Sequence, residues 1–285
     1  MADFKGSEKT VENTDNMSKA ALHAYRIQQA ATVKFPYLAI TLALVVLALA
    51  IAFYKFPRLD TTKDYRPTKA AEKGRSIWRY PHVVLGAVAI FVYVGAEVSI
   101  GSFLINYFNQ PNIAGLSALA AASFVPFYWG GAMVGRFIGS VVLRKVKTGH
   151  VLGIAAVVAG ILVVISMNTT FTSGVVTAYS VHILRWQSTL LIPHSLPMWS
   201  ILLVGFFNSI MFPSIFTLGV AEMGPLTGEA SGLLVTAIVG GAIIPEIQGV
   251  LADKIGIHHA FIIPVLCYIY IIYYGLRGSR ITQPT

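Results

Sequence analysis

Apolar residues occur in seven long runs that are separated by polar segments. The runs cover roughly residues 35–54, 83–107, 115–143, 151–168, 198–220, 230–252 and 258–276. A helix of about 20 apolar residues crosses the hydrocarbon core of a bilayer, and each run is near or above that length. The runs lack the alternation of a membrane β-barrel. The pattern therefore predicts seven transmembrane helices.

The composition supports this prediction. Charged residues form 12% of the chain, about half of the share that is typical of soluble domains. Among the charged residues, only Glu97, Arg136 and Glu246 fall inside the apolar runs. This excludes a soluble enzyme of two domains and predicts an all-α membrane protein. The single cysteine, Cys267, excludes an intramolecular disulfide and a cysteine-rich metal site.

Polar segments divide the chain into parts. Residues 1–34 form a polar segment without the apolar core of a signal peptide. The first predicted membrane helix, 35–54, is followed by a basic hydrophilic linker over 55–81. A bundle of six helices is expected over 82–276, with a short tail at 277–285.

Basic residues predict the orientation in the membrane. The net charge is +9, but the Lys and Arg residues lie in connecting segments and not on one soluble face, so no nucleic-acid partner is expected. They concentrate in 55–79, 144–147 and 277–280, which predicts a cytoplasmic linker and carboxyl terminus and a periplasmic amino terminus. The connection 169–196 is unusually apolar, and its Trp186 and Tyr179 indicate a short interfacial helix.

The run FVYVGAEVSIGSFLINYF, residues 91–108, carries a carboxylate near its middle. A charge at that depth costs roughly 3 kcal/mol, so Glu97 is expected to face a partner or a water-filled cavity. Gly101 and Ser102 could interrupt the helix and turn Asn106 inward, as in the broken helices of transporters. The alternative is that Glu97 only forms a hydrogen bond with a neighbouring helix.

Glycines mark positions of close helix packing. Gly131, Gly135 and Gly139 are four residues apart, a small-xxx-small stripe that lets two helices approach closely. Gly240 and Gly241 predict a second close contact. These five residues are therefore expected to serve packing or gating.

The run FFNSIMFPSIF, residues 206–216, combines an amide with a proline. Pro213 removes a helix hydrogen bond and frees the carbonyl of Ser209, which predicts a kink beside Asn208. An amide beside aromatic rings suits a sugar, because hydroxyls need paired hydrogen bonds and the C–H faces stack on rings. Alternatively, Asn208 only joins neighbouring helices.

Other residues within the apolar runs have weaker signals. Pro245 predicts a second kink, and Gln248 is a polar side chain at depth. Glu246 could line the cavity, pair with Arg185 or Lys254, or lie near the outer interface, and we favour the interface. Arg136 lies about two turns before a basic cluster, so it is expected to snorkel or to pair with a carboxylate near the cytoplasmic gate.

The sequence contains no catalytic motif. It lacks the HExxH helix, the GxSxG elbow, the phosphate loop and the dinucleotide fingerprint. His258 and His259 are adjacent and do not have the spacing of helical zinc ligands. The chain is therefore expected not to be an enzyme and to need no metal or cofactor.

Together these motifs closely resemble the fucose/glucose-galactose permeases of the major facilitator superfamily, which are proton-linked sugar symporters of twelve helices. The matching segments are FVYVGAEVSIGSFLINYF (91–108), GRFIGS (135–140), FNSIMFPSIF (207–216) and SGLLVTAIVGGAIIPEIQG (231–249). The resemblance covers about residues 18–276. It implies that 35–54 is helix six, the last of the amino-terminal half, and that the later spans are the six-helix carboxyl-terminal half.

The resemblance also implies roles for individual residues. The implied carboxyl-terminal wall of the sugar cavity contains polar and aromatic side chains, namely Glu97, Asn106, Phe127, Tyr128, Trp129, Asn208 and Gln248. The family's proton-coupling carboxylates lie in helices that have no counterpart in this chain. Glu246 departs from the apolar residue expected after Pro245.

A site of this family forms between two six-helix halves that rock against each other. We therefore expect an incomplete hexose and proton symporter of the bacterial inner membrane, embedded in the lipid bilayer and inactive alone. A first alternative is a half-transporter that pairs with a second copy or with a separate amino-terminal half. A second is a sensor that binds sugar without transporting it.

Overall fold

The structure, a computed structural model, describes residues 37–47, 76–170, 176–183 and 186–281, with the single positions 18, 20, 34, 49 and 53. The chain divides into two compact units, residues 1–66 and 67–285. In the first unit, an apolar helix covers Tyr37–Leu47, inside the span predicted over 35–54. Most of the predicted polar segment and most of the predicted linker lie outside the described residues.

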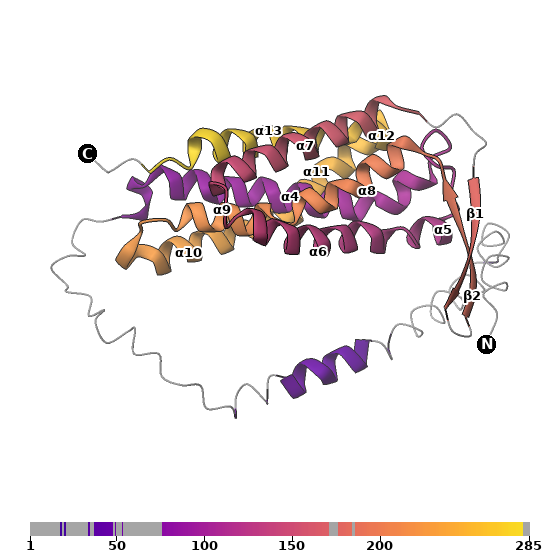
Figure 1. The fold of residues 1–285 in the computed structure, drawn as a ribbon, viewed down its shortest axis with the longest axis horizontal. Helices are drawn as coiled ribbons and strands as arrows, with labels where there is room; N and C mark the ends of the chain where they lie inside the picture. Colours follow the sequence, from indigo (N-terminus) through magenta and orange to yellow (C-terminus); the bar gives the residue numbers. More distant parts are fainter. Residues whose placement is uncertain are drawn as a thin grey trace. The chain divides into compact units, whose positions relative to one another are not determined.

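The second unit contains six helical spans of membrane length (Figure 1). They begin and end close to the predicted positions, which confirms an all-α membrane bundle. The spans are Pro81–Asn109 (α4); Ala118–Ala122 (α5) with Val125–Val142 (α6); Thr148–Asn168 (α7); Leu196–Asn208 (α8) with Met211–Gly219 (α9); Thr227–Thr236 (α10) with Gly240–Ile255 (α11); and Ile257–Ala260 (α12) with Ile262–Tyr273 (α13). Short turns of other helix types complete them at Ile77–Arg79 (η3), Gly224–Leu226 (η4), Ala237–Val239 (η5) and Tyr274–Gly278 (η6).

Local chemistry sets several helix starts. Helix α4 begins at Pro81, where the missing backbone N–H would have no partner within the helix and the fixed φ suits the first turn. Helix α8 begins after Ser195, whose Oγ accepts a hydrogen bond from the Met198 N–H at 3.3 Å. Such caps satisfy backbone donors that have no helical partner.

Helix α4 lies at the centre of the bundle. It packs against α9, α11 and α13, while α8 packs against α6 and α7. Figure 1 shows α7 and α13 along the upper edge of the bundle and α6 and α10 along the lower edge. The helices are apolar on most faces, so their neighbours decide which face is buried.

The connection between α7 and α8 forms a β-hairpin and not the predicted interfacial helix. Strands Val176–Ile183 (β1) and Trp186–Pro193 (β2) pair antiparallel, with Ile183 opposite Trp186. The sequence VTAYSVHI of β1 is rich in β-branched and aromatic residues, which favour strands, and two residues suffice to join a hairpin. The presence of Trp and Tyr alone was thus an insufficient signal for a helix.

Helix α4 continues without a break through Gly101 and Ser102, so the predicted interruption is wrong. Neither residue lacks a backbone N–H, and the helical hydrogen bonds can therefore continue. Gly101 makes room for a ring instead, because a Cβ added there would lie 3.2 Å from Cζ2 of Trp129. Asn106 stays exposed on the same helix.

Two other spans are irregular. Helix α8 ends at Asn208 and α9 begins at Met211, so the break falls just before Pro213, where a kink was predicted. Helix α11 runs through Pro245 from Gly240 to Ile255, and the irregular turn of that span is η5, which lies earlier.

Candidate functional site

Three helices meet at the side chain of Asn208, which ends α8. The Tyr268 hydroxyl of α13 donates a hydrogen bond to Asn208 Oδ1 at 2.7 Å. Asn208 Nδ2 donates to the Tyr128 hydroxyl of α6 at 3.0 Å. All three side chains are at most 1% exposed. The amide is therefore held on both sides inside the bundle.

Helix α4 adds a tyrosine and a carboxylate to this network. The Tyr93 hydroxyl lies 2.8 Å from Glu97 Oε1 and 2.9 Å from the backbone oxygen of Asn208, and it donates toward both. The Tyr128 hydroxyl donates to the backbone oxygen of Glu97 at 3.4 Å. Glu97 is the partly exposed member of the network. A polar chain thus connects an accessible carboxylate with the buried Tyr268.

Arg136 of α6 lies at the break between α8 and α9. Its Nε and one terminal nitrogen each lie 3.4 Å from the Ser209 backbone oxygen. That carbonyl is the one that Pro213 leaves without a helical donor. The Arg136 side chain therefore reaches the break from α6, one residue along the chain from Asn208.

A cavity of about 290 Å³ opens beside this arginine. Its lining combines one cation, one hydroxyl and apolar groups, from Arg136, Ser140, Leu143, Ile210, Phe212 and Pro213. The Phe212 ring lies 6.3 Å from the Tyr93 ring. The cavity and the polar network therefore share one region of the bundle.

Aromatic rings of α6 border the same region. Trp129 is 48% exposed, and its ring meets the Tyr128 ring edge-on at 5.2 Å. Phe127 is 47% exposed and packs at 5.8 Å against Phe124. Of these two rings, Trp129 is the one that contacts the network through Tyr128, and an exposed ring can stack on the apolar face of a sugar.

Two predicted site residues lie apart from this network. Asn106 is exposed, and its backbone oxygen accepts a hydrogen bond from Gln110 Nε2 at 3.3 Å. Gln248 is fully buried, and within the described part of the chain neither of its amide atoms has a hydrogen-bond partner. The structure thus brings together only some of the polar residues that the resemblance implied.

The predicted glycine stripe of α6 lies against α8 and the start of α9. A Cβ added to Gly131 would lie 3.6 Å from the backbone nitrogen of Phe206. A Cβ on Gly135 would lie 2.6 Å from Ser209 Oγ, and one on Gly139 would lie 3.2 Å from Ile210 Cβ. A Cβ would therefore clash at Gly135 and Gly139, whereas at Gly131 it would make only an ordinary contact.

A second glycine contact joins α11 to α4. A Cβ on Gly240 would lie 2.6 Å from the Phe91 carbonyl carbon. A Cβ on Gly241 would lie 3.0 Å from Val94 Cγ1. Glu246, further along α11, is exposed.

The tyrosines of the network were the residues that sequence reasoning undervalued, above all Tyr268. A phenol within an otherwise aliphatic membrane span must find a hydrogen-bond partner, because lipid offers none. That signal was present at Tyr93, Tyr128 and Tyr268, but the sequence did not identify Asn208 as the common partner. Within the described ranges, no three His, Cys, Asp or Glu residues converge as metal ligands.

No family model matches the chain. Individual proteins do. The chain is 48% identical over 261 residues to the glucose/galactose transporter of Brucella abortus (strain 2308), covering 92% of this chain and 57% of that protein. It is 36% identical over 277 residues to a putative glucose/galactose transporter of Helicobacter pylori (strain J99), covering 95% and 59%. The L-fucose-proton symporter of Escherichia coli (strain K12) is 29% identical over 269 residues, covering 93% and 56%.

A solved structure of a transporter also matches this chain over part of the transporter's length. The major facilitator superfamily transporter FucP, in its outward conformation, superposes with a TM-score of 0.65 at 27% sequence identity. The match covers 94% of this chain and 60% of FucP. The chain thus spans less than two thirds of the length of the relatives that it matches.

Proposed function

Because the chain belongs to the major facilitator superfamily, we propose that its six-helix bundle supplies one wall of the path in a proton-linked hexose transporter. The bundle corresponds to the carboxyl-terminal half of such a transporter, and the helix Tyr37–Leu47 to the span before it. The opposite wall comes from a six-helix amino-terminal half or from a second copy. The relatives that support this are named as glucose/galactose transporters and an L-fucose-proton symporter.

The observation that carries the proposal is that the partly exposed Glu97 lies in the same region of the bundle as Arg136 and the exposed Trp129, since Tyr93 links it to Asn208 and Arg136 reaches Ser209. Tyr93 donates to one oxygen of the carboxylate and thereby orients it. In the proposed site Glu97 accepts hydrogen bonds from sugar hydroxyls, Arg136 donates to them, and the Trp129 ring stacks on the sugar face. Asn208 positions the tyrosines and does not contact the sugar itself, because its amide forms hydrogen bonds with Tyr128 and Tyr268.

The proposal includes a bacterial inner-membrane location, with a periplasmic amino terminus and a cytoplasmic carboxyl terminus. The concentration of basic residues in 144–147 and 277–280 supports this orientation. A cysteine introduced at Arg280 should react with a membrane-impermeant thiol reagent only after the cells are opened. Reaction in intact cells would reverse the orientation.

The transport experiment joins this chain to the part of the Brucella abortus relative that lies outside the matching segment. Uptake of labelled glucose, galactose and fucose is then measured in vesicles with and without a proton gradient. The joined protein should accumulate at least one of these sugars when the gradient is present. A correctly inserted joined protein that neither binds nor transports any hexose would refute the proposal.

Two controls accompany this experiment. The unjoined chain should show no uptake, and uptake by the unjoined chain would favour a transporter built from two copies. In the joined protein, Glu97→Gln should raise KM about tenfold, the effect of weakening charged hydrogen bonds. The matched variant Glu246→Gln, which removes another exposed carboxylate, should leave KM unchanged. Equal effects of both substitutions would exclude a specific role for Glu97.

A further inference from the structure

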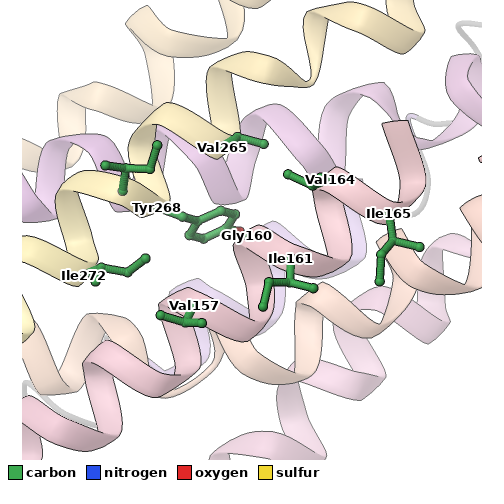
Figure 2. Close-up of a pocket in the computed structure, with 9 residues that line it drawn as sticks. Val157, Gly160, Ile161, Val164, Ile165, Val265, Tyr268 and Ile272 are labelled. Carbon is green, nitrogen blue, oxygen red and sulfur yellow. The ribbon is translucent and has the colours of Figure 1, made fainter. Parts of the chain in front are cut away.

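An apolar groove runs between α7 and α13, away from the polar site. Its volume is about 270 Å³. Figure 2 shows the side chains that line it, with the Tyr268 ring between the two helices. The lining is almost wholly aliphatic and consists of Val157, Gly160, Ile161, Val164, Ile165, Val265, Tyr268, Ile269 and Ile272.

The groove faces a different side of the bundle from the candidate sugar path. Helices α7 and α13 lie along one edge, and α6, which carries Arg136 and Trp129, lies along the other (Figure 1). Tyr268 belongs to both regions, because its ring lines the groove while its hydroxyl reaches Asn208. A ligand in the groove would therefore contact the back of the polar network without entering the path.

The two helices that form the groove also meet at a basic corner. Gly149 and Gly275 touch there, since a Cβ on Gly149 would lie 2.5 Å from the Gly275 oxygen. Exposed side chains flank this contact at the start of α7 and in η6 and the residues after it, namely Lys147, His150, Arg277 and Arg280. His150 precedes Val157 by two helical turns, so it lies on the groove face of α7.

From this combination we propose that one anionic phospholipid binds along α7 and α13. Its phosphate lies at the basic corner and one acyl chain occupies the groove. Basic pockets between membrane helices attract anionic headgroups, whereas an aliphatic groove favours an acyl chain. From His150 to Gly160 within α7 the helix rise is about 15 Å, which matches the roughly 15 Å of one hydrocarbon leaflet. Headgroup and chain can therefore reach their sites together.

Lipid binding to the full chain, purified in detergent, can be measured by native mass spectrometry with phosphatidylglycerol and phosphatidylcholine. Phosphatidylglycerol should bind the unaltered chain more tightly than phosphatidylcholine. The double substitution Arg277→Ala and Arg280→Ala should weaken phosphatidylglycerol about thirtyfold, given the usual contribution of each basic residue at a membrane surface. Equal binding of both lipids to the unaltered chain would overturn the proposal.

The matched charge control is Arg144→Ala with Lys145→Ala, which removes two exposed cations from the loop after α6. This pair should weaken phosphatidylglycerol less than about threefold, well below the loss expected at the corner. A loss equal to that of the Arg277 and Arg280 pair would mean diffuse attraction and would overturn the site.

The groove is tested without changing any charge. Gly160→Leu places a side chain next to Tyr268, whose Cβ would lie 3.5 Å from the new Cβ. It should weaken phosphatidylglycerol about tenfold by displacing two or so methylene groups of the chain. Gly232→Leu on α10 is the control, because a Cβ there meets no described atom within 4 Å. Unchanged binding in Gly160→Leu, or equal competition by glycerol phosphate without acyl chains, would overturn the role of the groove.

Discussion

Helix α4 and helix α6 have similar apolar sequences but different surroundings. In α4, 56% of the most apolar stretch is buried, whereas the share is 22% in Ala118–Val142 and also in Gly224–Ile255. Glu97 and Arg136, the charged residues of the candidate site, lie on α4 and α6. The bundle therefore has a well-packed interior and a flank whose helices pack on one side and leave their other side exposed in the described structure.

The difference follows from side-chain size and polarity. On α4, small residues let other helices approach, and tyrosines form hydrogen bonds with them. At Gly95, for example, an added Cβ would lie only 2.7 Å from Ile244 Cβ. On α6, large apolar side chains such as Met133 and Phe137 are 62% and 70% exposed. In a membrane such a surface is covered by lipid or by another helical half.

The largest expected effect concerns the interior. Asn208→Leu should lower the free energy of unfolding by about 3 kcal/mol, because it leaves the hydroxyls of Tyr128 and Tyr268 buried without their partner. Unfolding of the chain by SDS in mixed micelles measures this change. Asn106→Leu, an exposed amide-to-leucine change, should stay within about 0.5 kcal/mol of the unaltered chain. Similar losses for both variants would contradict the network.

A somewhat smaller effect is expected where the two regions meet. Gly135→Val should destabilise the chain by about 2 kcal/mol, because overpacking would push α6 away from α8. The same unfolding assay applies. Gly130→Val on the same helix shares the cost of a β-branched residue, but a Cβ there meets no described atom within 4 Å. If Gly130→Val were equally destabilising, helix propensity and not packing would explain both results.

The smallest effect is expected at Gln248. Its buried amide has no hydrogen-bond partner among the described residues, so Gln248→Leu should leave stability unchanged or raise it by about 1 kcal/mol. Thermal unfolding in detergent would measure the shift. A clear loss of stability would mean that the amide binds something that α4 and α11 do not supply, such as an ordered water.

Much of the fold was predictable because membrane spans depend on local hydrophobicity. The six spans of the bundle begin and end near the predicted residues, and the break beside Asn208 lies where Pro213 indicated it. Predictions that depended on partners were less successful. Gly101 and Ser102 do not break α4, because the glycine accommodates Trp129 from another helix. The hairpin after α7 was missed because aromatic residues suit an interfacial helix and a strand equally well.

The candidate site was predictable in part for the same reason. A carboxylate within an apolar run is unusual, so the sequence alone selects Glu97 as a candidate site residue, whereas it predicts a gating or packing role for Arg136. The partner of a polar side chain cannot be selected in this way. The sequence suggests direct sugar contact by Asn208, but tyrosines from α6 and α13 form hydrogen bonds with its amide, and Gln248 is buried without a described partner.

The sequence by itself determined the position, length and polarity of the six membrane-length helices that the structure describes, since each span must satisfy its backbone hydrogen bonds and match the bilayer without help from the others. Tertiary structure alone decided which side chains meet. Tyr93, Tyr128 and Tyr268 lie far apart along the chain, and only the packing of α4, α6 and α13 around the end of α8 brings their hydroxyls to Asn208. The physical reason is that a hydrogen bond between helices forms or fails with a change of a few tenths of an ångström in the donor–acceptor distance. Close glycine contacts set the distance between helices, and hydropathy does not encode it.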